Sequence, residues 1–233
     1  MHREILQALD ESLYPDIIRR GGLAAAMDST AQENGIPLGP VRPCSDFGDA
    51  RYTTAKMNSE RGPVTVFLGL KKRLFVITLE GNVRPWSSGS TEDLVAAVKA
   101  MSEWRRGVTL EELNNLFPFM SYDNFSRALE RGDPVERRWE EILDNEEFVS
   151  SWPLLRRVRE DNFLCTLFPF ISHGVLHLST DYSSRTADQV WIAPVGTGGY
   201  RVGATFASGE EKTSETIERA MGDAVSLLRE RRW

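Results

Sequence analysis

The sequence predicts an α+β fold, with one antiparallel sheet built from two similar βββα-like halves, helices packed on it and a helical insert between the halves. Two groups of short segments alternate apolar and polar residues, which is the period of half-buried strands. The segments around them repeat apolar residues every three or four positions, as amphipathic helices do. Turn residues at hairpin spacing separate the strands, so neighbouring strands should run antiparallel.

The composition is that of a globular protein. Of the 233 residues, 41% are hydrophobic and 27% are charged, which excludes a disordered or low-complexity chain. No apolar stretch approaches the roughly 20 residues of a membrane span, and the first residues lack the apolar core of a secretory signal. Cys44 and Cys165 lie far apart, which indicates a reducing compartment. We therefore expect a cytoplasmic protein with no membrane partner, forming a single domain over residues 1–233.

The first half, residues 1–108, combines N-terminal helices with three strands and a closing helix. Helical spacing predicts a helix over residues 23–33, which Asn34-Gly35 would end. The second and third strands are apolar on both faces, so they should lie at the centre of the sheet and be covered on both sides. The expected strands are residues 50–57, 64–68 and 74–79, and the closing helix runs from a Ser90 cap to Gly107.

The insert, residues 109–168, is predicted to be a cluster of short acidic helices. Thr109 with Glu112 forms a capping-box pattern, and Asp133-Pro134 marks a second helix start. Residues 109–162 carry 13 acidic residues and 7 arginines, so they hold the whole net charge of −6. Phosphate binding requires a basic surface, so this charge disfavours a nucleic-acid partner.

The second half, residues 169–233, repeats the pattern of three strands and a helix. Val64 and Leu74 have counterparts 126 positions later, at Val190 and Tyr200, and the helices that follow begin about 123 positions apart. Three antiparallel strands with one helix on their face form a natural two-layer unit. Because the two halves share little sequence identity, a true repeat and a coincidence of spacing both remain open.

One residue of the insert and three of the second half are candidates for catalysis, and no sequence motif supports them. They are Cys165, His173, His177 and Asp181. His173 and His177 would stand about 13 Å apart on one strand, too far to bind one metal ion. Cys165, His173 and Asp181 could form a nucleophilic triad, but the sequence has no Gly-x-Ser-x-Gly elbow. Cys165 in its apolar segment is typical of a small core residue. We expect no metal and no cofactor.

Residues 86–91 (WSSGST) are the candidate ligand-binding segment. Backbone N–H groups and the hydroxyls of Ser87, Ser88 and Ser90 at a helix N-terminus could bind a phosphate or a carboxylate. The alternative, which we favour, is a serine cap beside a tryptophan that packs on the sheet. Trp86 and Trp233 have no evident core position, so they indicate a surface that meets a ligand or partner.

Five stretches of the sequence resemble an uncharacterised actinobacterial family whose members carry the label "natural product biosynthesis protein". The resemblance implies an association with the biosynthesis of specialised metabolites, and it implies no reaction and no site residues. The stretches are residues 61–69 (RGPVTVFLG), 86–91 (WSSGST), 104–107 (WRRG), 130–134 (ERGDP) and 167–179 (LFPFISHGVLHLS).

Two functions of different classes follow from these observations. The favoured one is an accessory, non-catalytic protein of natural-product biosynthesis that binds a peptide, a carrier protein or an enzyme, because no coherent set of catalytic residues is present. The alternative is a small enzyme acting on an anionic metabolite. There His173 or His177 would be the general acid or base, and the segment from Ser87 to Ser90 would hold the anionic group.

Overall fold

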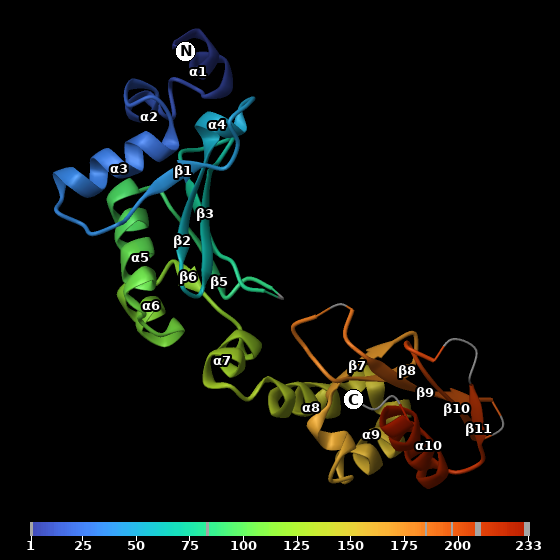
Figure 1. Cartoon of the computed structure of the whole chain (residues 1–233). Coiled ribbons are helices and arrows are strands. Elements are labelled where there is room, and N and C mark those ends of the chain that lie inside the picture. The colour runs from blue at the N-terminus through green and yellow to red at the C-terminus, as the bar shows by residue number, and fades with distance from the viewer. Residues whose placement is uncertain (1, 83, 185, 197, 208–210, 231–233) are drawn as a thin grey trace. The chain divides into compact units, whose positions relative to one another are not determined.

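The chain contains two compact units, residues 1–130 (unit 1) and residues 131–233 (unit 2). Each unit has its own antiparallel sheet and its own apolar core (Figure 1). The α+β class is confirmed, but the expectation of one sheet shared by both halves is wrong, because each half closes a separate core. The boundary divides the expected insert between the units. The structure, a computed structural model, describes residues 2–82, 84–184, 186–196, 198–207 and 211–230.

Unit 1 is a six-stranded sheet in sequential order, with helices on one face. Its strands are β1 (Val41–Pro43), β2 (Thr54–Ser59), β3 (Gly62–Leu68), β4 (Phe75–Leu79), β5 (Ser87–Thr91) and β6 (Met120–Ser121). Its helices are α1 (His2–Ala8), α2 (Pro15–Arg19), α3 (Leu23–Glu33), α4 (Ala50–Thr53), α5 (Leu94–Arg106), α6 (Leu110–Leu116) and α7 (Asn124–Arg131), the last of which ends at the unit boundary.

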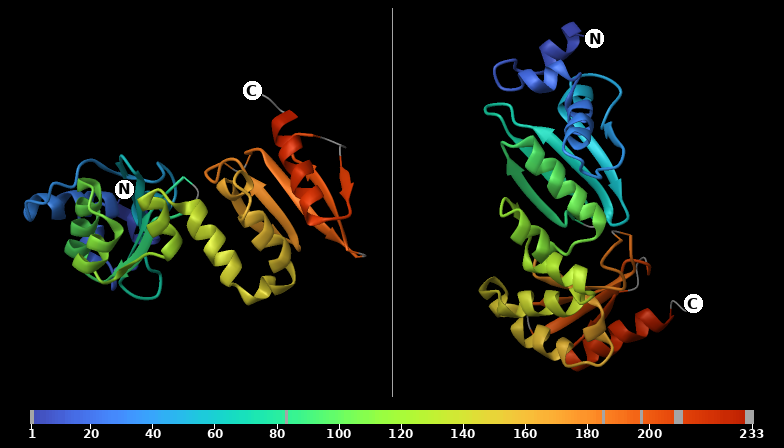
Figure 2. Two further views of the ribbon diagram at one scale, coloured as in Figure 1. Left: turned by 90° about the horizontal axis from the view of Figure 1, so that it is seen from below. Right: turned by 90° about the vertical axis from the view of Figure 1, so that its left-hand side faces the viewer.

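The hairpin of β3 and β4 lies at the centre of the sheet, as predicted. The cross-strand pairs Val64–Leu79 and Val66–Ile77 are fully buried on one face, where α3 and α5 pack (Figures 1 and 2). On the other face Phe67 is 42% exposed. The expectation of cover on both sides is therefore wrong, because both long helices lie on the same face.

Local signals at helix ends were predicted with mixed success. α3 ends at Glu33 with Asn34 as its C-cap, and Gly35 follows with a φ of 63°, as expected. The Thr109 capping box is present at the start of α6. α5 begins after Asp93, whose carboxylate accepts a hydrogen bond of 2.8 Å from the Val95 N–H, so the predicted Ser90 cap is wrong. Ser90 instead belongs to β5, where backbone pairing with β4 determines its conformation.

Unit 2 is a five-stranded sheet, also in sequential order, with its helices on one face (Figures 1 and 2). The buried side chains of β8 and β9, such as Leu178 and Ile192, belong to one core with those of the helices. The elements are α8 (Pro134–Asp144), η1 (Glu146–Ser151), α9 (Trp152–Arg159), η2 (Leu164–Thr166), β7 (Phe168–Ser172), β8 (Val175–Ser179), β9 (Gln189–Val195), β10 (Gly199–Ala204), β11 (Lys212–Ser214) and α10 (Ile217–Glu230).

The two units share an order of elements, in which an antiparallel meander is followed by a helix. Val64 lies in β3 and Val190 in β9, which are the third strands of their sheets. α5 and α10 begin at Leu94 and Ile217, 123 positions apart. Both meanders are longer than the three predicted strands, since short strands such as β1 in unit 1 and β11 in unit 2 pair at their edges.

No helix in the part of the chain that the structure describes is long and apolar enough to cross a membrane.

Candidate functional site

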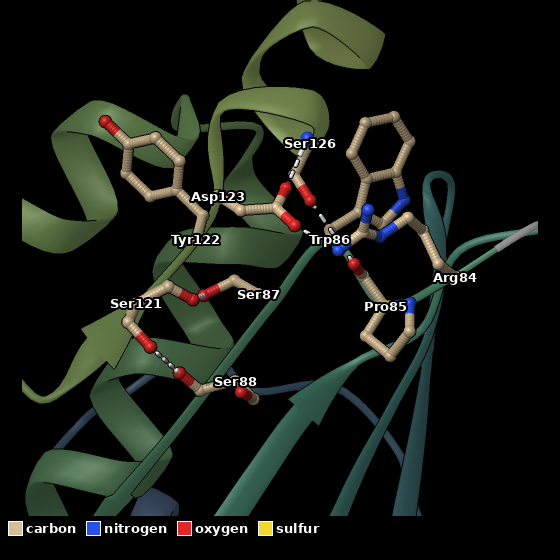
Figure 3. A pocket seen from close by; sticks show the side chains of 9 residues that line it. All are labelled: Arg84, Pro85, Trp86, Ser87, Ser88, Ser121, Tyr122, Asp123 and Ser126. Atoms are coloured by element: carbon tan, nitrogen blue, oxygen red, sulfur yellow. Dashed lines mark hydrogen bonds and ion pairs between the residues drawn. The ribbon is translucent and has the colours of Figure 1, made fainter. Parts of the chain in front are cut away.

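A pocket of about 390 Å³ opens in unit 1 beside β5, β6 and the start of α7 (Figure 3). This volume lies at the low end of the range for small-molecule sites, roughly 300–1,000 Å³. Trp86, Ser87 and Ser88, three of the predicted ligand-binding residues, line it, whereas Ser90 does not. The lining residues are Arg84, Pro85, Trp86, Ser87, Ser88, Ser121, Tyr122, Asp123 and Ser126.

The pairing of β5 with β6 builds the floor of the pocket. The Ser87 hydroxyl, which is almost fully buried, donates a hydrogen bond of 2.8 Å to the Ser121 carbonyl. The Ser121 hydroxyl in turn donates to the Ser88 carbonyl at 3.1 Å. A Cβ at Gly89 would lie 2.2 Å from the carbonyl oxygen of Phe119, so only glycine lets β6 approach this closely. Ser87, Ser88 and Gly89 therefore lie in a strand that is paired on both sides, and the predicted helix N-terminus is absent here.

Trp86 joins the pocket to the core of unit 1. Its indole N–H donates a hydrogen bond of 3.1 Å to the Arg61 carbonyl, and its ring lies 6.4 Å from the ring of Trp104. Trp86 is thus half-buried and packed against the core, as the favoured alternative of a tryptophan packed on the sheet has it, and the expectation that it lacks a core position is wrong. Trp233, the other tryptophan expected at a surface, lies outside the described residues.

An ion pair between Arg84 and Asp123 supplies the charge of the pocket, and Figure 3 shows the two side chains pointing towards each other. Asp123 also caps α7, since its carboxylate accepts a hydrogen bond of 2.7 Å from the Ser126 N–H. Burial raises the pKa of Asp123, but the hydrogen bond from the Ser126 N–H and the charge of Arg84 outweigh burial and hold that pKa below its usual value. Asp123 is therefore a carboxylate at neutral pH.

The other end of α7 is held by a second ion pair. Arg61 contacts Glu130 at 2.9 Å and donates to the Val108 carbonyl at 2.6 Å. Its guanidinium lies 3.2 Å from the centre of the buried Trp104 ring. Glu130 also accepts hydrogen bonds of 3.1 Å from the Leu110 N–H. Ion pairs at both ends therefore fix α7, the helix that forms one wall of the pocket, on unit 1.

The two candidate histidines, His173 and His177, lie in unit 2. The expectation that they share a strand is wrong. His173 occupies the two-residue turn between β7 and β8 with a φ of 51°, followed by Gly174 at 77°. Positive φ at both positions is what a tight type I′ hairpin requires, and it twists the chain between the strands. The Nδ1 atom of His173 lies 3.1 Å from the Ser172 hydroxyl.

His177 stands in a row of side chains across the uncovered face of the second sheet. It pairs with Phe170 on one side and Trp191 on the other, and its ring stacks on Phe170 at 4.7 Å. Trp191 lies over Gly203, whose Cβ would be 2.3 Å from the indole. Burial lowers the pKa of His177, so the ring is neutral at pH 7.

The remaining catalytic candidates form contacts elsewhere. The Cys165 carbonyl, in η2, accepts a hydrogen bond of 2.9 Å from the Trp139 indole. The Asp181 carboxylate accepts bonds of 2.7 and 2.6 Å from Ser183, which lower its pKa and close the turn after β8. Within the described residues, no hydrogen bond joins Cys165, His173 and Asp181. No group of three or more acidic, histidine or cysteine side chains among the residues described could hold a metal ion.

Sequence reasoning missed Arg84 and Asp123, the charged pair of the site. Asp123 could have been found from its own segment, because an aspartate just before a helical run is a common N-cap. Its partner could not, since the two residues lie 39 positions apart and no local pattern links them.

Residues 133–231 match a family of unknown function, DUF6193. This region is almost the same as unit 2, so the pocket of unit 1 lies outside the match. Neither the curated proteins nor the solved structures contain a match to this chain.

Proposed function

We propose that the protein is a non-catalytic binding protein whose first unit holds a small polar ligand in the pocket beside β5 and α7. One observation carries the proposal. The pocket walls are fixed by hydrogen bonds and by ion pairs at both ends of α7, while Arg84 and Asp123 remain 42% and 46% exposed. Fixed walls with accessible charges are what a ligand site requires, because little ordering has to occur on binding.

The chemistry of the lining residues favours binding over catalysis. A general acid or base works best with a pKa near the operating pH. Asp123 has its pKa lowered away from that range, and an arginine guanidinium offers hydrogen-bond donors but no acceptor. The hydroxyls of Ser87, Ser121 and Ser126 donate to backbone carbonyls, so a base does not activate them as nucleophiles.

Binding at the pocket can be tested by nuclear magnetic resonance on the full chain. The probes are D-glucose, acetate, methylamine and L-alanine, each at millimolar concentration. We expect at least one probe to shift the Trp86 indole N–H, assigned with Trp86→Phe, together with the Ser126 amide. The shifts should disappear in Arg84→Ala and persist in Arg42→Ala, which removes an exposed arginine from β1 at the opposite edge of the sheet. If none of the probes shifts either signal, the proposal is wrong.

We further propose that the protein serves natural-product biosynthesis in an actinobacterium. Besides the small ligand of the pocket, it binds a protein or peptide of that pathway as its partner. The resemblance of the five stretches named above supports this, and so does the label that the family carries. The test is deletion of the gene in its host, together with co-purification of the tagged protein. Loss of a metabolite and recovery of a biosynthetic enzyme are expected, and an unchanged metabolite profile with nothing specific recovered would contradict the proposal.

One observation favours the enzyme as a second candidate. Burial keeps His177 neutral at pH 7, the form that a general base needs. His177 and His173 belong to unit 2, whereas Ser87–Ser90 belong to unit 1. If the protein is an enzyme, His173→Ala or His177→Ala should abolish formation of the pathway product. An unchanged yield in both variants would exclude this candidate.

A further inference from the structure

We infer that the pocket of unit 1 takes a small zwitterion of the α-amino-acid class, with its carboxylate on Arg84 and its ammonium group on Asp123. The inference rests on the proposed function, since it names the ligand of the same site. It starts from the ion pair that lines the pocket, in which one cation and one anion face each other.

Both members of the pair have hydrogen-bonding capacity left. A guanidinium has five N–H donors, and Arg84 uses one of them on Asp123. The Asp123 carboxylate accepts bonds from Arg84 and the Ser126 N–H, and its two oxygens offer about four acceptor positions. A ligand carboxylate can therefore bind Arg84 while a ligand ammonium binds Asp123, without removing the cap of α7.

The charge balance of the pocket disfavours ligands that carry only a positive or only a negative charge. Arg84 and Asp123 are the charged residues among those that line it, and their charges cancel. An anion on Arg84 is repelled by Asp123, and a cation on Asp123 is repelled by Arg84. A ligand that carries both charges meets an opposite charge at each end, so both of its charged groups are paired.

The spacing of the pair sets the spacing of the ligand charges. Arg84 and Asp123 are in direct contact, so the two charged groups of the ligand must also be close together. In an α-amino acid one carbon carries both groups, whereas a chain extends by roughly 3.3–3.6 Å per residue and separates its termini. The small volume of about 390 Å³ agrees with a single amino acid, and Trp86 and Pro85 offer apolar surface to its side chain.

Isothermal titration calorimetry on the full chain tests this inference with four probes. L-Alanine carries both charges, N-acetyl-L-alanine only the carboxylate, L-alaninamide only the ammonium group, and D-glucose neither. We expect L-alanine to bind at least about ten-fold more tightly than any of the other three. The advantage should shrink as the salt concentration rises, because the contacts are ionic and partly exposed.

Three variants assign the contacts to their residues. Arg84→Gln should abolish the preference of L-alanine over L-alaninamide, and Arg84→Lys should restore part of it. Asp123→Asn should abolish the preference of L-alanine over N-acetyl-L-alanine, and asparagine still caps a helix, so α7 should remain formed. Arg42→Gln, at the far edge of the sheet, should leave all four affinities unchanged. Circular dichroism melts check that each variant is folded.

The outcomes separate this inference from the proposed function. If D-glucose or a singly charged probe binds the pocket as tightly as L-alanine, the zwitterion is wrong and the binding function stands. If L-alanine keeps its preference in both Arg84→Gln and Asp123→Asn, the ligand lies elsewhere and the inference is overturned. If none of the four probes binds the wild-type protein, the inference and the proposed function both fail.

Discussion

The two units follow the same order of elements, yet they present different chemistry. Across the uncovered face of the first sheet runs a polar row, in which Lys56, Thr65, Thr78 and Ser88 are cross-strand neighbours. Across the corresponding face of the second sheet runs a row of Phe170, His177, Trp191 and Gly203. A shared topology therefore leaves the exposed side chains free to differ, since the covered face alone has to build the core.

The pocket of unit 1 forms where the meander meets elements that follow α5, the last element that the two units share in their order. After α5 the chain forms α6, β6 and α7, and β6 pairs with β5 to extend the sheet. Asp123 and Ser126 lie in this addition, while Arg84, Trp86 and Ser88 belong to the meander. Among the residues that the structure describes, unit 2 has no counterpart of β6 beside β11. The comparison suggests that the meander supplies the scaffold and the added segment supplies the site.

The largest expected effect comes from breaking the ion pair that holds α7 on unit 1. Arg61→Ala should destabilise unit 1 by about 3 kcal/mol, because Glu130 is left partly buried without its partner. Hydrogen exchange should show lost protection in α7 and α5, with the strands of unit 2 unchanged. Arg106→Ala is the matched control, since its exposed pair with Glu103 contributes less than about 0.5 kcal/mol. Equal loss in both units would show that their stabilities are coupled.

Substitution of one glycine in each sheet compares how far the two sheets can adjust to an added methyl group. Gly89→Ala drives a methyl group into the backbone of β6, so we expect a loss of about 3 kcal/mol and a distorted pocket. Gly203→Ala drives a methyl group into the Trp191 indole, a side chain that can rotate, so the loss should be nearer about 1 kcal/mol. Urea unfolding measures both losses. A greater loss for Gly203→Ala would mean that the aromatic row is the stiffer structure.

The smallest expected effect is a difference in acid sensitivity between the units. The pKa of His177 is lowered in the folded protein, so its contribution is complete above the unfolded value, about 6.5, and is lost as the pH falls below it. The pKa of Asp123 is also lowered, so its contribution is complete above about 3.9 and is lost at more acid pH. Hydrogen exchange at pH 7 and 5.5 should therefore show less than about 1 kcal/mol of loss, confined to unit 2.

Two variants control this measurement. In His177→Gln the loss between pH 7 and 5.5 should disappear, and in Asp123→Asn it should remain. If unit 1 loses stability over the same interval, the assignment of the effect to His177 is wrong.

Part of the candidate site could be predicted from the sequence. Hydroxyls at an expected helix N-terminus single out Ser87 and Ser88, the lack of an evident core position singles out Trp86, and all three residues line the pocket. The predicted helix N-terminus is wrong, since Ser87 and Ser88 lie in β5 and Trp86 directly precedes that strand. The sequence places the partner segment, with Asp123 and Ser126, in the acidic helical insert, because helix-start patterns at Thr109 and Asp133 flank it.

The sequence by itself determined the features that depend on neighbours within a few residues. The C-terminal ends of α3 and α5, the capping box of α6 and the β3–β4 hairpin are of this kind, since caps, turns and alternation act over one to four positions.

Only the tertiary structure decided the division into two sheets, the strand formed by Ser87–Thr91 and the contact of Arg84 with Asp123. A segment of serine, glycine and threonine has little strand propensity of its own, and it becomes a strand because β4 and β6 offer backbone partners on both sides. Two charges 39 residues apart meet only when the packing of α7 against the sheet brings them together.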